Sequence, residues 1–204
     1  MKHLKKLLSL LALIMLCSGN NSIGAIVNPS FEDGPYGDWV VPTGWTMHNS
    51  DNFGEGVENY WMTQGDYSYN LWSFVYQANT VGAYESIYQI VNLTGITEIL
   101  FDVRLSCEFY GNPCTFQDYM AVFLVDGTPY WTGTSAGTYI NQSIDVSGLS
   151  PGPHTIELRQ ECIKNESYDP SCWTQWDNLR AIPEPATLLL LGLGGLFLRK
   201  RKYI

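Results

Sequence analysis

Positively charged residues are scarce in the central part of this 204-residue chain. Of its eleven Lys and Arg, only four lie within residues 26–182, whereas the same span holds 19 of the 20 Asp and Glu, a net charge of −15. A segment this acidic repels the phosphate backbone of nucleic acids and anionic lipid headgroups. Nucleic-acid binding is therefore excluded, and acidic polysaccharides are disfavoured as ligands unless calcium bridges them.

The residues that common catalytic machinery needs are also few. The chain has three His, and it lacks the G-x-S-x-G, H-E-x-x-H and phosphate-binding glycine motifs. His154 follows Pro151-Gly152-Pro153 at the start of a predicted strand, a position typical of a turn. Glycoside hydrolysis requires only two suitably spaced carboxylates, and no pair stands out among the 19 acids. We therefore expect no enzyme, and a glycoside-active enzyme is the remaining alternative of this class.

Helical periodicity longer than a turn or two is absent from residues 26–182, where apolar and polar residues alternate instead. Every second residue from Ile99 to Leu105 is apolar, which is typical of a half-buried strand. Asp126-Gly127 separates two such runs and predicts a type I′ hairpin. Strands are predicted at 67–74, 86–91, 98–106, 119–125, 128–132, 138–145, 155–161 and 174–181. Short strands at this spacing predict an all-β fold, a single β-sandwich of the jelly-roll type.

The N-terminal 25 residues have the pattern of a secretory signal peptide. Three lysines precede an apolar run from Leu7 to Leu16, and a small, polar stretch ends at Ala25. The alternative is a lipoprotein signal with Cys17 as the lipidated residue, but Leu16 stands where lipoproteins carry a small residue. We predict export and a mature chain that begins near Ile26.

The C-terminal residues 183–204 form a second targeting segment. Pro183, Glu184 and Pro185 lead into an apolar run at 186–198, and Arg199-Lys200-Arg201-Lys202 follows. As a helix, 13 residues span roughly 20 Å, which is short for a hydrocarbon core of about 30 Å. The basic cluster predicts a cytoplasmic end, with the central domain outside. A simple hydrophobic anchor is one interpretation of this short transmembrane segment.

This tripartite order closely resembles the PEP-CTERM sorting signal of Gram-negative bacteria. In that family an exosortase, a membrane cysteine protease, recognises and processes the tail during export. The resemblance implies the exosortase machinery as a partner. It also implies transient anchoring in the inner membrane and a final place in the cell envelope or extracellular matrix. It implies nothing about the ligand of the central domain.

Four cysteines remain after the signal peptide, and an even count in an exported protein indicates two disulfides. They have neither the C-x-x-C spacing nor the neighbouring His of a zinc site. Each pair brackets a loop between predicted strands, which favours Cys107–Cys114 and Cys162–Cys172. If both loops lie at the same end of the sandwich, cross-pairing remains possible.

Short motifs in a fixed order resemble galactose-binding-like jelly rolls, including carbohydrate-binding modules of the cellulose- and xylan-binding type. The series runs from Asn28-Pro29-Ser30-Phe31-Glu32 through Gly65-Asp66-Tyr67-Ser68 to Trp176-Asp177-Asn178-Leu179. Many of those modules hold a structural calcium where the first and last strands meet. The resemblance implies Glu32 and Asp177 as its ligands, with Asp66 as a weaker third. Calcium prefers six to eight oxygen ligands, which carboxylates supply. The alternative is that Glu32 is a surface acid and Asp177 caps a turn.

Aromatic residues are the most abundant candidates for a binding site, since the chain holds seven Trp and thirteen Tyr. Sugars place an apolar C–H face on aromatic rings, while their hydroxyl groups bind polar side chains. Trp45 and Trp176 are expected in the core. The residues expected to be exposed, because Gly, Pro and polar neighbours mark them as loop residues, are Tyr36, Trp39, Tyr60, Trp61 and Trp173.

The sequence therefore predicts a non-catalytic domain that binds a neutral extracellular polysaccharide and contacts the membrane only through its C-terminal segment. A structural or adhesive surface protein without a sugar site explains the export signals, the acidity and the cysteines equally well. The two hypotheses differ in where the aromatic residues lie. Clustering on one accessible face favours a binding module, and distribution through the core favours a structural protein.

Overall fold

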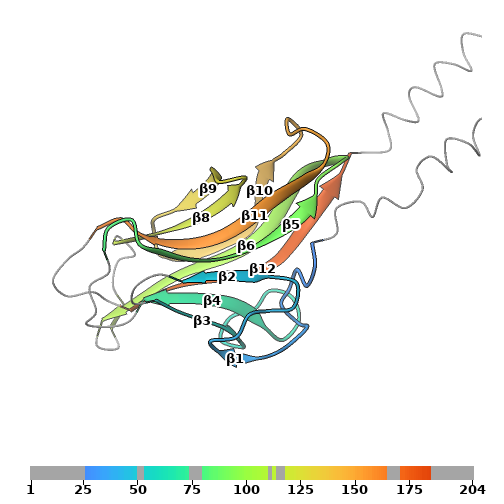
Figure 1. The fold of residues 1–204 in the computed structure, drawn as a ribbon. Coiled ribbons are helices and arrows are strands. Elements are labelled where there is room, and N and C mark those ends of the chain that lie inside the picture. Colours follow the sequence, from blue (N-terminus) through green and yellow to red (C-terminus); the bar gives the residue numbers. More distant parts are fainter. Residues whose placement is uncertain are drawn as a thin grey trace, which may run out of the picture.

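The computed structural model describes residues 26–49, 53–73, 80–109, 112–113, 118–164 and 171–184 (Figure 1). Within these ranges the regular structure consists of strands alone, and no helix there is long and apolar enough to cross a bilayer. The predicted signal peptide and the apolar run at 186–198 lie outside the described residues. The strands are β1 (Gly37–Asp38), β2 (Thr46–Asn49), β3 (Phe53–Glu58), β4 (Ser68–Ser73), β5 (Tyr84–Asn92), β6 (Ile96–Phe109), β7 (Asn112–Pro113), β8 (Tyr119–Val125), β9 (Thr128–Gly133), β10 (Gly137–Asp145), β11 (Pro153–Cys162) and β12 (Ser171–Pro183).

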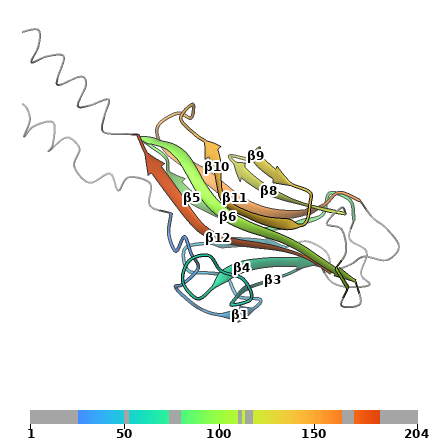
Figure 2. The ribbon, with the colours of Figure 1, turned by 180° about the vertical axis from the view of Figure 1, so that it is seen from behind.

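Two antiparallel sheets pack face to face as a β-sandwich, which confirms the predicted fold class (Figures 1 and 2). The larger sheet has the order β1-β3-β4-β12-β6-β10, and β7 pairs with β6. The smaller sheet has the order β2-β5-β11-β8-β9. The long strands β6 and β12 run side by side through the middle of the larger sheet, as the view from behind shows (Figure 2). These two strands therefore form the middle of the outer face of the larger sheet.

The core lies between the sheets and is built by the alternation that the sequence predicts. On β6, every second residue from Ile99 to Leu105 is buried. Phe101 contacts the rings of Phe123 and Trp131 on the smaller sheet and that of Trp176 on its own sheet. Trp45 and Trp176 are buried, as predicted. Because these aromatic side chains fill the interior, they are not available to a ligand.

The turn between β8 and β9 also follows the prediction. Asp126 and Gly127 both have positive φ angles, of 50° and 75°, as a type I′ turn requires. His154 lies beneath this turn, with its Nδ1 2.6 Å from an Asp126 carboxylate oxygen and its Nε2 2.8 Å from the carbonyl oxygen of Ser150. The hydrogen bonds with Asp126 and with Ser150 favour the protonated ring and raise the pKa of His154. His154 is thus a structural residue of the turn.

Two bulges interrupt the larger sheet, on the two strands that flank β6. One lies on β12 at Asn178 and the other on β10 at Asn141, and both residues have positive φ angles. Between them, on β6, Asp102 accepts hydrogen bonds from the Asn141 backbone N–H (2.6 Å) and the Asn178 side-chain amide (2.9 Å). Leu179 turns into the core and donates its backbone N–H to Pro29, which ties the start of the domain to its last strand.

Candidate functional site

The outer face of the larger sheet carries two ordered rows of side chains. Residues directly opposite each other on adjacent strands form each row, and their chain neighbours point into the core because side chains alternate along a strand. One row is aromatic and polar, and the next, two residues further along each strand, is polar. The rows are Trp72–Trp173–Ser106 and Asn70–Gln175–Arg104, on β4, β12 and β6 respectively.

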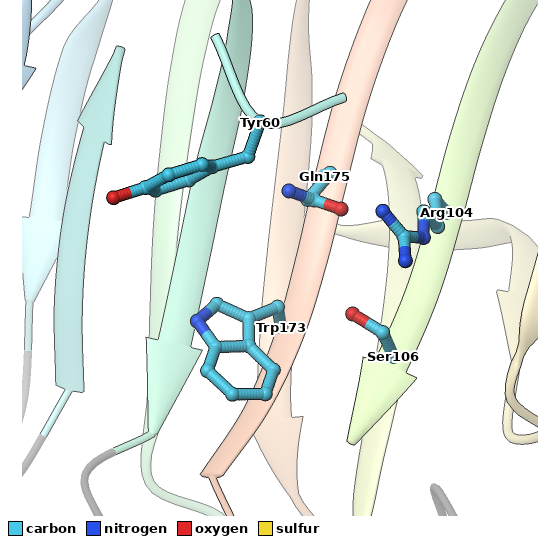
Figure 3. Close-up of a pocket in the computed structure, with 5 residues that line it drawn as sticks. All are labelled: Tyr60, Arg104, Ser106, Trp173 and Gln175. Atoms are coloured by element: carbon cyan, nitrogen blue, oxygen red, sulfur yellow. The ribbon is translucent and has the colours of Figure 1, made fainter. Parts of the chain in front are cut away.

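A pocket of about 340 Å³ lies over these rows. Its volume is within the range of small-molecule sites. Figure 3 shows Tyr60 and Trp173 on one side and the polar ends of the other three residues directed into the same space. Gln175 is only 4% exposed, and its side-chain carbonyl oxygen has no hydrogen-bond partner. The oxygen itself is shielded from solvent, so a ligand hydroxyl group reaches it only if the side chain turns further into the pocket. The lining residues are Tyr60, Arg104, Ser106, Trp173 and Gln175.

The loop between β3 and β4 folds over this face and carries Tyr60, which is 71% exposed. The buried carboxylate of Asp177 holds the loop, since it accepts the backbone N–H groups of Thr63 (2.5 Å) and Gln64 (2.9 Å). The Thr63 hydroxyl also donates to Asp102. Burial raises the pKa of Asp177, and the hydrogen bonds from the loop lower it in part. The two aspartates therefore position the aromatic wall of the pocket.

Trp39 and Trp72 extend the aromatic surface beyond the pocket. Trp39 is 54% exposed, and its ring meets that of Trp72 edge to face at 6.2 Å. Gly54 on β3 makes room for the indole of Trp72, because a Cβ there would lie 2.4 Å from the ring. The glycine thus lets Trp72 lie against the outer face of its own sheet.

The five predicted ligand-binding aromatics divide between the pocket and its surroundings. Tyr60 and Trp173 line the pocket, whereas Tyr36, Trp39 and Trp61 do not. Tyr36 is 47% exposed but stacks on Tyr67 at 3.8 Å, and its hydroxyl donates to the Glu32 carbonyl oxygen. Trp61 is half-buried in the same loop as Tyr60.

Sequence reasoning did not single out the polar residues of the pocket. Arg104, Ser106 and Gln175 stand on the polar side of two alternating strands, where such residues are usually solvated. Only the register of β6 against β12 places them together. That register depends on residues far apart in the chain, so no local sequence signal marks these three.

The three predicted calcium ligands gather around the loop that carries Tyr60, but the carboxylates of Glu32 and Asp177 bind protein donors. One Glu32 oxygen accepts the backbone N–H groups of Asp66 and Tyr67, both at 2.9 Å. Asp177 accepts the backbone N–H groups of Thr63 and Gln64 in the same loop. Among the described residues, no three His, Cys, Asp or Glu side chains are grouped as a metal site would require. Oxygens that already accept N–H groups do not fit a cation site without rearrangement, and calcium stays a prediction.

Two carboxyl groups on the same sheet, Glu58 and Asp38, bear on the question of catalysis. Burial and a hydrogen bond with Asp38 raise the pKa of Glu58 to about 7. A glycosidase pair flanks the sugar with its carboxyl groups about 5–10 Å apart. Carboxyl groups in hydrogen-bond contact share a proton instead, so this pair lacks the geometry for glycoside hydrolysis.

Three of the four predicted disulfide cysteines come together at one end of the core. Cys107 and Cys172 are buried directly opposite each other on β6 and β12. Cys162 is buried on β11, where the Gln160 side chain donates to the Cys172 carbonyl oxygen. No disulfide joins these three, and Cys114 lies outside the described residues. The strand ends that carry these three cysteines thus lie at the same end of the sandwich, which is the arrangement that leaves the connectivity open.

Solved structures that are similar to this chain include two carbohydrate-binding modules. TmCBM61, solved in complex with β-1,4-galactotriose, has a TM-score of 0.51 at 16% identity, over 80% of this chain and 100% of that chain. A non-crystalline cellulose specific module, CBM28, has a TM-score of 0.49 at 13% identity, over 78% and 96%. A cyclase from Fischerella sp. TAU has a TM-score of 0.48 at 18% identity, over 80% and 98%. At these identities the comparison establishes the fold and not the ligand.

Sequence comparison identifies the C-terminal segment. Residues 181–202 match the PEP-CTERM protein-sorting motif, which confirms the targeting signal predicted there and implies export and sorting to the surface. No protein of curated function matches the chain. The chain therefore carries a PEP-CTERM sorting motif at the end of an antiparallel β-sandwich whose fold is similar to that of TmCBM61.

Proposed function

We propose that this protein is exported and sorted by an exosortase, and that its β-sandwich binds a glycan without catalysis on the outer face of the larger sheet. The observation that carries the proposal is the pocket between Tyr60 and Trp173. Two aromatic rings there stand beside the orphaned, buried acceptor of Gln175. Stacking surface next to fixed hydrogen-bonding groups is what an apolar sugar face and its hydroxyl groups require.

The direction of β12 supports this role in a surface protein. The pocket lies at Trp173 and Gln175, and the same strand ends eight residues later at Pro183, where the sorting motif follows. At about 3.3 Å per residue, roughly 25 Å of strand separate the two. While the C-terminal segment holds the protein at the inner membrane, the pocket thus lies away from the attachment point.

Titration calorimetry of the full-length protein with a panel of oligosaccharides tests the proposal. Trp173→Ala removes the ring at the floor of the pocket and is expected to lower affinity at least tenfold. Tyr130→Ala is the matched control, because Tyr130 is a partly exposed aromatic on β9 of the other sheet. Equal binding by both variants would refute the site. If the folded protein binds no oligosaccharide of the panel, the result favours the alternative, a structural or adhesive surface protein.

The calcium hypothesis has its own test. A calcium ion held by Glu32 and Asp177 would raise the melting temperature when calcium replaces EDTA, and Asp177→Asn would abolish that rise. If the melting temperature is the same in calcium and in EDTA, these carboxylates do not bind calcium. Their function is then only to accept the hydrogen bonds from the loop.

A further inference from the structure

The geometry points to an anionic sugar as the ligand, with a carboxylate or sulfate group bound by Arg104. This inference rests on the proposed glycan-binding function and defines its ligand class. It differs from the neutral polysaccharide that the net charge predicts. The reason is that Arg104 places a guanidinium group inside the pocket, although the domain around it is acidic.

Among the described residues, Arg104 differs from the other positively charged residues of the domain, because its guanidinium group has no hydrogen bond or ion pair to another side chain there. Arg159 binds the carboxylates of Glu157 and Glu161, and the Lys164 ammonium group lies 4.0 Å from a carboxylate oxygen of Asp118. Arg180 donates to the side-chain oxygen of Asn141, and no similar bond is found for Arg104 within the described part of the chain. A half-buried guanidinium group without an acceptor has all its donors available.

The residues beside Arg104 supply further contacts but no counter-ion. Its direct cross-strand neighbours are Gln175 on β12 and Thr138 on β10, both uncharged. The Ser106 hydroxyl and the Arg104 guanidinium group turn toward the same space (Figure 3). A planar guanidinium group binds carboxylate or sulfate with two parallel hydrogen bonds, while the Trp173 ring offers a surface for the sugar.

Two acids on the same strands as Arg104 and Gln175 are engaged by other protein groups. Asp102 and Asp177 lie two residues along β6 and β12, and their carboxylates accept N–H and O–H groups of the loop and of the bulges. The net charge of the domain acts over longer distances, and salt screens it beyond about 8 Å at physiological ionic strength. Within the pocket, the guanidinium group is therefore the dominant charge.

Calorimetry on the full-length protein with matched ligands tests the inference. The probes are trisaccharides of uronic acids, each paired with its carboxyl-reduced form, and sulfated galactan oligosaccharides, each paired with its desulfated form. We expect the anionic member of one pair to bind roughly ten- to a hundredfold more tightly, as charge-assisted hydrogen bonds provide. Arg104→Gln is expected to abolish that preference and to retain binding of the neutral member. Arg180→Gln, an arginine on the same sheet outside the pocket, is the control and should retain the preference.

The outcomes separate this inference from the proposed function. Preference for one anionic member that disappears in Arg104→Gln supports both, and the pair that shows it distinguishes carboxylate from sulfate. Equal or tighter binding of the neutral members overturns the anionic ligand and leaves glycan binding in place. Absence of binding to every member, by protein with an unchanged melting temperature, overturns both.

Discussion

Two glutamates face each other inside the core and provide the sharpest test of the structure. Glu55 of β3 and Glu85 of β5 come from opposite sheets, and both are buried. The Asn49 side-chain amide donates to Glu55 at 2.8 Å and lies 3.4 Å from Glu85, while the second oxygen of Glu85 and the Tyr69 hydroxyl have no partner. Burial and the hydrogen bond with Glu55 raise the pKa of Glu85 far above neutrality. Glu85 is therefore protonated in the folded protein at pH 7.

The cost of this arrangement follows from proton linkage. The unfolded chain releases the Glu85 proton near the ordinary pKa of 4.5, and the folded protein retains it. Above that pH the unfolded state binds fewer protons, so the free energy of unfolding falls by about 1.4 kcal/mol per pH unit. By pH 7 the loss is about 3 kcal/mol, a sizeable part of the total stability of a domain.

Glu85→Gln removes this penalty and keeps the shape of the side chain, since the amide can donate to Glu55. We expect the variant to match the native protein near pH 4.5 and to exceed its stability by about 2–3 kcal/mol at pH 7. Urea unfolding followed by tryptophan fluorescence from pH 4 to pH 8 measures both. Asp33→Asn, which removes the same charge at an exposed site, should show no comparable slope. A stability difference that does not change with pH would refute the buried, protonated carboxyl group.

Three further predictions concern other parts of the sandwich. Asp102→Asn replaces the acceptor between the two bulges and the loop, and should lower the free energy of unfolding by about 2–4 kcal/mol in urea titrations. Gly54→Ala should displace the tryptophan of β4 and weaken glycan binding more than it lowers the melting temperature. His154→Gln tests the bond to Asp126: the pKa of His154 is raised and that of Asp126 is lowered. The stability lost in the variant should therefore be largest between about pH 4 and 6.5 and shrink as pH rises through the raised pKa or falls through the lowered one.

The predicted strands correspond to β4–β6 and β8–β12, and β1, β2, β3 and β7 were not predicted. The strands predicted from alternation, such as the one at 98–106, are present with boundaries that differ by only a few residues. The strand β3 was missed because its residues do not have the usual pattern of apolar side chains inward and polar side chains outward. Gly54 and Gly56 point outward, and Glu55 lies in the core. Apolar alternation is the signal for a half-buried strand, and β3 has glycine and a buried acid in its place.

Some residues of the candidate site can be predicted from their neighbours in the chain, and others depend on how distant strands pair. Tyr60 and Trp173 were predicted because their exposure follows from their own neighbours in the chain. Arg104 was counted only as one of four positive charges, since its place beside Gln175 depends on the pairing of β6 with β12. The neutral ligand was predicted from the net charge of the domain. A net charge does not say where the individual charged groups lie. A single guanidinium group in a pocket can therefore oppose it locally.

The features that make the site also weaken the sheet around it. The outward glycine on β3 that admits Trp72 contributes no packing, and the inward Glu55 faces a carboxyl group that resists ionisation. The β3–β4 loop is held instead by hydrogen bonds to Asp177 and Asp102. A ligand that contacts Tyr60 adds contacts to this loop, so amide hydrogen exchange should slow at Thr63 and Gln64 more than in the core strands, whose opening already requires global unfolding. Uniform slowing across the domain, or none at the loop, would place the ligand elsewhere.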